Sequence, residues 1–161
     1  MFDTVLIAGL GLMGGSMAKT IKARTLSRVL GWNRTRATAE QARADGTIDA
    51  VATEALYKEA DLVIIGLYPQ ATVDWLLENM PKMKKGCVIV DMVGVKQFMV
   101  DHLEQAALDA GVHYVGGHPM AGREFSGLDF ALSTLFDGAS MIFVPTKSST
   151  ERVLEQLEAY F

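Results

Sequence analysis

A glycine-rich turn, Gly9-Leu10-Gly11-Leu12-Met13-Gly14, lies between an apolar run and a helical pattern. The run Thr4–Ala8 predicts a strand, and residues 14–24 predict a helix. In such a unit the first glycine permits a tight turn, the second lets a phosphate approach the backbone, and the third allows close helix packing. The turn therefore predicts a dinucleotide-binding site. Its predicted contact residues are Gly9, Gly11, Leu12, Met13 and Gly14. The alternative is a glycine-rich turn that binds no ligand.

The remaining pattern predicts an α/β fold. Strands are expected at residues 28–32, 49–52, 61–67, 87–91, 112–115 and 140–144, and helices at 35–45, 70–80, 96–110 and 150–160. Near-continuous apolar strands that alternate with helices indicate a mainly parallel sheet with helices on both faces. We therefore expect one Rossmann-like, doubly wound domain over residues 1–161. Ligands bind such sheets at the carboxyl ends of the strands.

The end of the second predicted strand bears on the choice of cofactor. An acidic residue there would bind the ribose 2′-hydroxyl of NAD, but the sequence is Asn33-Arg34-Thr35. Arg34 can pair with a 2′-phosphate, and the Thr35 hydroxyl can donate to it. This favours NADP, and the alternative is NAD bound through Asn33. Residues 1–50 carry seven Lys/Arg against four Asp/Glu, which also suits an anionic ligand.

Two further positions follow predicted strands. His118 lies in a glycine-rich segment, residues 116–127, after the strand at 112–115. A glycine-rich loop can approach a ligand closely, so a histidine in such a loop at this edge of the sheet is a candidate proton acceptor. Pro69 follows the strand at 61–67, where we expect it to shape the loop beside the cofactor ribose.

Three segments resemble the prephenate/arogenate dehydrogenase family of tyrosine biosynthesis. They are residues 9–16, residues 91–96 and the His-Pro-Met-Ala-Gly-x-Glu-x-Ser-Gly loop that starts at His118. The resemblance implies an oxidoreductase that uses NAD(P)+ to oxidise and decarboxylate prephenate to 4-hydroxyphenylpyruvate, or arogenate to tyrosine. It implies that His118 helps remove the proton of the ring hydroxyl. It also places Lys96 near the nicotinamide and Glu124 at the site entrance.

Two departures from the family pattern are visible. Gly94 stands where the family often has a serine that orients the histidine, so water, backbone or Ser126 would have to orient His118. Family members also carry a helical domain that forms a homodimer and helps bind the substrate, and we expect that this chain lacks it. The apolar face around Leu154, Leu157, Tyr160 and Phe161 is where we expect such a segment to pack.

Composition narrows the function classes further. The net charge is -4 and the pI is about 5.3, which argues against a nucleic-acid surface. No apolar run reaches the length of a membrane span, and the first residues lack the basic start of a signal peptide, so a cytoplasmic location is expected. The single cysteine, Cys87, allows no internal disulfide or cysteine-based metal cluster, and no metal site is expected.

Two rival interpretations remain open at this point. One is another reductase with this nucleotide fold, such as a β-hydroxyacid dehydrogenase or an imine reductase. The other is a non-catalytic dinucleotide-binding or regulatory module.

Overall fold

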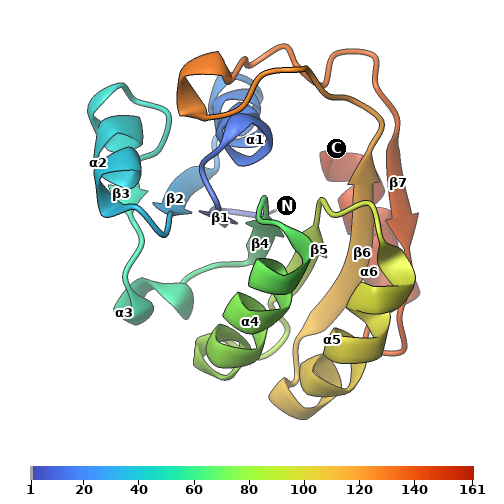
Figure 1. Cartoon of the computed structure of the whole chain (residues 1–161). Coiled ribbons are helices and arrows are strands. Elements are labelled where there is room, and N and C mark those ends of the chain that lie inside the picture. Colours follow the sequence, from blue (N-terminus) through green and yellow to red (C-terminus); the bar gives the residue numbers. More distant parts are fainter. Residues whose placement is uncertain (1) are drawn as a thin grey trace.

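Seven strands form one sheet in the order β3-β2-β1-β4-β5-β6-β7 (Figure 1) in the computed structural model, which describes residues 2–161. Neighbouring strands run parallel, except that β7 is antiparallel to β6. The strands are β1 (Thr4–Ala8), β2 (Arg28–Trp32), β3 (Ala50–Val51), β4 (Leu62–Ile65), β5 (Val88–Asp91), β6 (His113–Pro119) and β7 (Met141–Val144). This is the predicted Rossmann-like architecture.

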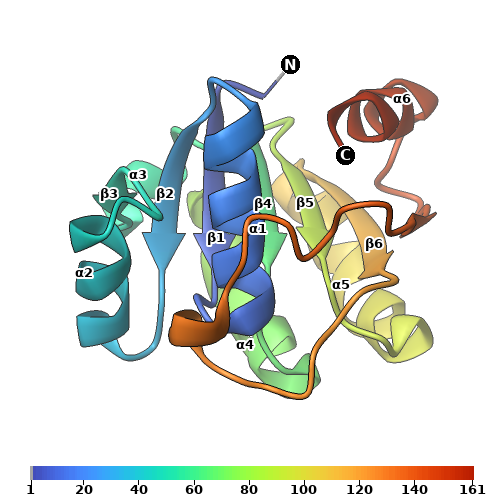
Figure 2. The ribbon, with the colours of Figure 1, turned by 90° about the horizontal axis from the view of Figure 1, so that it is seen from above.

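Helices cover both faces of the sheet because the strands bury alternate residues on opposite sides. The helices are α1 (Leu12–Arg24), α2 (Arg36–Ala44), α3 (Glu54–Tyr57), α4 (Pro69–Asn79), α5 (Lys96–Ala110) and α6 (Glu151–Tyr160). In β1, Val5 and Ile7 face the core under α1, α2 and α6, whereas Leu6 and Ala8 face the core under α3, α4 and α5. Figure 2 shows α1 and α6 on the same side of the sheet.

The chain changes direction between β1 and β4, which are neighbours in the sheet. From β1 the strands proceed to β2 and β3 on one side, and then from β4 to β7 on the other. The crossover segments therefore diverge at this point and leave a crevice at the carboxyl ends of the strands, where doubly wound sheets bind ligands. No helix among residues 2–161 is long and apolar enough to cross a bilayer.

The main difference from the predicted elements lies at β6. The expectation that this strand ends at Val115 is wrong, because residues 116–119 continue it and pair with β7. His118 is therefore a strand residue opposite Ile142 and not part of a loop. The pairing partner lies more than twenty residues away in sequence, so the local pattern did not reveal it. The short helix α3 was also not expected.

The last helix packs against the domain itself. Leu157 is fully buried in the core, and Tyr160 meets Phe2 edge-on at a ring-centroid distance of 5.2 Å. The Tyr160 hydroxyl also lies 2.8 Å from the hydroxyl of Ser27. Leu157 and Tyr160 thus already have partners within the domain, whereas Phe161 of the same face is 41% exposed. That a further segment packs on this face stays a prediction.

Candidate functional site

A cleft of about 510 Å³ opens at the carboxyl ends of β1, β4 and β5. Four segments line it. They are the glycine turn at residues 11–13, the β4–α4 loop at 66–69, the turn at 92–95, and residues 122–127 except Glu124. Of the predicted site residues, Gly11, Leu12, Met13 and Pro69 lie in this wall. The cleft thus occupies the crevice that the strand order predicts.

The three glycines of the turn have different surroundings. Gly9 has a φ of +94°, and a Cβ there would lie 2.6 Å from the carbonyl oxygen of Gly66. A Cβ on Gly14 would lie 1.8 Å from the carbonyl oxygen of Gly9. A Cβ on Gly11 would meet nothing within 4 Å. Gly9 and Gly14 are therefore required by the packing of the turn, whereas Gly11 leaves an open backbone surface in the cleft.

The N-terminus of α1 lies at this open backbone surface. Gly11 is the N-cap of α1, no side chain caps it, and the first turn of the helix contains no acidic residue. The first amide groups of a helix lack partners within it and carry partial positive charge, so they favour an anion. The open backbone at Gly11 and the uncapped helix start fit the pyrophosphate of a dinucleotide.

Asn33 has a role that the sequence did not predict. Its side-chain oxygen accepts from the backbone amide of Leu10 at 3.0 Å, and its amide donates to the carbonyl of Thr35 at 3.1 Å. Asn33 therefore braces the glycine turn against the end of β2. Arg34 and Thr35 follow directly and are exposed beside that turn, outside the lining of the cleft. Among the described residues Arg34 forms no ion pair, whereas Arg36 pairs with Glu40 at 2.8 Å.

His118 lies behind the 92–95 wall of the cleft. A Cβ built on Gly94 would lie 3.8 Å from its Cε1 atom, and this is the only atom within 4 Å of that position. The Nδ1 atom of His118 is buried and has no hydrogen-bond partner among residues 2–161. Ser126 lines the cleft but makes no hydrogen bond with His118. The presence of glycine at position 94, where the family often has serine, thus leaves an open space next to the imidazole of His118.

Lys96, at the start of α5, forms an ion pair with Asp91 rather than facing the cleft. Its side chain is 16% exposed. Burial lowers the pKa of Lys96 and the neighbouring Asp91 charge acts in the opposite direction. Asp91 also accepts from the Tyr114 hydroxyl at 2.7 Å. Neither Asp91 nor Tyr114 was predicted as a site residue, although an acidic residue at the end of the apolar run 87–91 was an available signal.

The loop after β6 carries the remaining candidates. Glu124 is exposed and does not line the cleft. Arg123 does line it, and its guanidinium lies 5.1 Å from the centre of the Phe125 ring. Phe125 in turn stacks on Phe130 at 4.8 Å. The cleft mouth is therefore bordered by a cation and an exposed aromatic pair.

Burial raises the pKa of the Cys87 thiol to about 12, so this side chain is an inert part of the core.

The fold, the glycine turn and the cleft at the switch point define a dinucleotide-binding Rossmann domain of the kind found in dehydrogenases. Residues 17–161 match the family described as "Prephenate dehydrogenase, nucleotide-binding domain". The chain belongs to this family. The matched range begins after the glycine turn, so the turn supports the assignment separately.

Individual relatives agree with the family. The chain is 36% identical to a prephenate dehydrogenase of Bacillus subtilis over 98% of its own length and 43% of the relative. It is 32% identical to a prephenate dehydrogenase of Lactococcus lactis, again over 98% of this chain and 45% of the relative. The crystal structure of A. aeolicus prephenate dehydrogenase with hydroxyphenyl propionate and NAD+ superposes with a TM-score of 0.89 at 26% identity, covering 99% of this chain and 56% of that one. The chain spans about half the length of these relatives.

Proposed function

We propose that this chain is the nucleotide-binding half of an NAD(P)-dependent prephenate or arogenate dehydrogenase. The observation that carries the proposal is that the open Gly11 backbone and the 92–95 turn line one cleft, and that His118 lies directly behind this turn, next to Gly94. The family of the chain and the NAD+ bound to the A. aeolicus relative support the same reaction.

The residues that line the cleft can be assigned to successive parts of a bound dinucleotide. Gly11, Leu12 and Met13 would hold the pyrophosphate at the start of α1, with Gly9 and Gly14 shaping the turn. Pro69 would border the ribose and the 92–95 turn would border the nicotinamide, which supplies the hydride acceptor when bound.

We further propose that the cofactor is NADP in preference to NAD. Arg34 is exposed, has no carboxylate partner within residues 2–161 and lies directly after the residue that braces the glycine turn. A guanidinium in this place suits a 2′-phosphate, and no acidic side chain at residues 33–35 repels one.

His118 is the proposed proton acceptor. Hydride leaves the ring carbon that bears the hydroxyl, and a carbonyl develops there as the proton leaves the oxygen. Histidine side chains exchange protons near neutral pH, so His118 can take this proton. The bond to the ring carboxylate then breaks with release of carbon dioxide, its electron pair makes the ring aromatic, and the resulting phenolate oxygen takes a proton back to give the phenol. Lys96 is proposed to contribute its positive charge near the nicotinamide from behind the cleft, where it is paired with Asp91. Glu124, which is exposed, is proposed to lie at the entrance of the site.

The proposal extends to the rest of the protein. The substrate is a small anion that must be enclosed for hydride transfer, but the described cleft has an open side. We propose that a helical segment beyond residue 161 closes it, binds the substrate carboxylate and forms a homodimer, and that the protein works in the cytoplasm.

The test is an assay of the full-length protein with prephenate or arogenate and either NAD+ or NADP+, followed by absorbance of the reduced nicotinamide. Substrate-dependent reduction supports the proposal. A second candidate, a dinucleotide-binding module without turnover, is favoured by Gly94, because no described residue forms a hydrogen bond with the Nδ1 atom of His118. Cofactor binding without substrate-dependent reduction would establish that candidate instead.

A further inference from the structure

Asp91 is a fully buried carboxylate at the end of β5. Its Oδ1 atom accepts from the backbone amide of Val93 at 2.8 Å and from the ammonium of Lys96. Its Oδ2 atom accepts from the Tyr114 hydroxyl at 2.7 Å. Burial and the charge of Asp91 raise the pKa of Tyr114, so the phenol stays protonated and donates. Three donors from three different segments therefore converge on one carboxylate.

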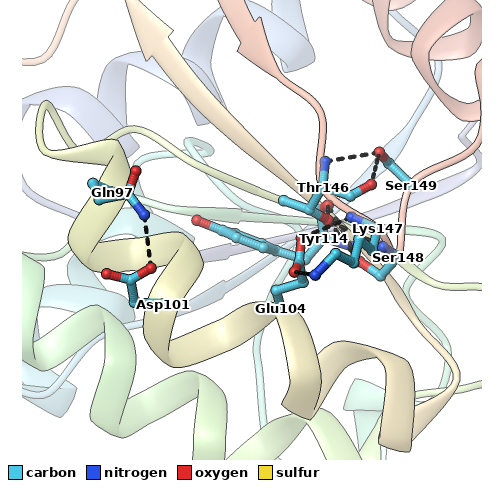
Figure 3. A network of polar contacts seen from close by, with 8 residues as sticks. All are labelled: Gln97, Asp101, Glu104, Tyr114, Thr146, Lys147, Ser148 and Ser149. Carbon is cyan, nitrogen blue, oxygen red and sulfur yellow. Dashed lines mark hydrogen bonds and ion pairs between the residues drawn. The ribbon is translucent and has the colours of Figure 1, made fainter.

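The donors of Asp91 are themselves anchored. The side chain of Lys96 crosses β6 at Gly116, where a Cβ would lie 2.9 Å from its Cδ atom. Tyr114 is held at its backbone, where its amide donates to the Ser148 hydroxyl at 2.9 Å and its carbonyl accepts from the Thr146 hydroxyl at 2.6 Å. Figure 3 shows the Tyr114 ring extending away from this serine- and threonine-rich turn towards the start of α5.

A buried ionic network of this kind contributes little net free energy to the stability of a fold. Removing a carboxylate and an ammonium from water carries a desolvation penalty that their attraction often fails to offset, and apolar replacements are frequently as stable. What the network does provide is fixed geometry. The Val93 amide is held two residues beyond β5, within the 92–95 turn that lines the cleft and places Gly94 beside His118.

We propose that Asp91 and Tyr114 are positioning residues, which hold the 92–95 turn and Lys96 in the arrangement that receives the cofactor. This inference rests on the proposed dinucleotide site. Neither residue lines the cleft, so their effect on the cofactor is transmitted through Val93 and Lys96.

The test compares two variants with a matched control in the same chain. Tyr114→Phe removes the donor to Asp91, and Asp91→Asn removes the charge that Lys96 faces. Tyr160→Phe is the control, because it removes a part-buried tyrosine hydrogen bond, to Ser27 just before β2, away from the cleft at the carboxyl ends of the strands. NADH and NADPH affinities are measured by nicotinamide fluorescence, and exchange of the Val93 amide by NMR.

The expected result is a loss of affinity of roughly three- to tenfold in Tyr114→Phe, the range for one lost hydrogen bond. Tyr160→Phe should change affinity by less than about twofold while lowering thermal stability to a similar extent. Asp91→Asn should speed exchange of the Val93 amide relative to the Ile89 amide in β5. Tyr114→Phe should add little in the Asp91→Asn background, because both changes act through the same carboxylate.

Equal effects of Tyr114→Phe and Tyr160→Phe on affinity would overturn the proposal, as would fully additive losses in the double variant. If the unmodified chain bound neither NADH nor NADPH, the proposed function would fail instead. In that case the Val93 exchange still decides the positioning role: unchanged exchange in Asp91→Asn would reject it, and selective acceleration would support it.

Discussion

Two arginines follow β2, and they differ in their partners. Arg36 pairs with Glu40, whereas Arg34 is exposed and unpaired among the described residues. We expect Arg34→Ala to weaken NADP binding by roughly 10- to 100-fold, the range for a charge-assisted contact, with little effect on NAD. Arg36→Ala is the control and should change neither affinity by more than about twofold. Fluorescence titration with NADH and NADPH checks this. If the unmodified chain bound both cofactors equally tightly and Arg34→Ala changed neither affinity, the NADP preference would be rejected.

The open space at Gly94 gives a second prediction at the scale of one residue. A serine there would place a hydroxyl close to the imidazole of His118, whose buried Nδ1 atom has no hydrogen-bond partner in the described part of the chain. In the full-length protein we expect Gly94→Ser to raise the turnover rate by roughly three- to tenfold, because a hydrogen bond would orient the imidazole. Gly94→Ala adds the same carbon without the hydroxyl and should give no gain. Similar turnover rates in the serine and alanine variants would show that orientation of His118 is not limiting.

At the scale of elements, the glycines between β1 and α1 have different roles: Gly14 is needed for folding, whereas Gly11 is available for cofactor binding. A methyl group on Gly11 meets no protein atom, whereas one on Gly14 would overlap the Gly9 carbonyl at 1.8 Å. Gly11→Ala should therefore keep the melting temperature within a few degrees but weaken cofactor binding at least about tenfold, because it occupies the surface that the phosphates approach. Gly14→Ala should lower the melting temperature markedly. Thermal denaturation with and without NADPH measures both effects. Tight cofactor binding by Gly11→Ala would contradict the assigned phosphate site.

Local pattern was sufficient for many of these elements. The strands at 4–8 and 28–32 and the helix at 96–110 were predicted to the residue, because each combines a clear apolar period with a glycine or polar boundary. The extension of β6 through His118 depends on pairing with β7 and was missed. The convergence of Lys96 and Tyr114 on Asp91 was missed for the same reason, since it arises from the register of β5 against β6.

At the scale of the whole molecule, four segments line the cleft, but it stays open to the surface within the described residues. Arg123 lines it from the loop after β6, and His118 lies behind the 92–95 turn. We therefore expect the 161-residue chain to bind NADPH but to show no measurable turnover of prephenate or arogenate. Steady-state assays of this chain and of the full-length protein, at equal molar concentration, make the comparison. Comparable kcat values would show that one domain is sufficient.

The central claim is that the dinucleotide cleft and His118 form one catalytic site. The most direct measurement is the turnover rate of full-length His118→Asn, together with its affinity for NADPH. Loss of a general base lowers rates by about 100- to 10,000-fold, and we expect a decrease in this range with NADPH affinity within about twofold of the unmodified protein. Asparagine keeps a polar side chain of smaller size in β6, so the fold should persist. Near-normal turnover in this variant would contradict the account.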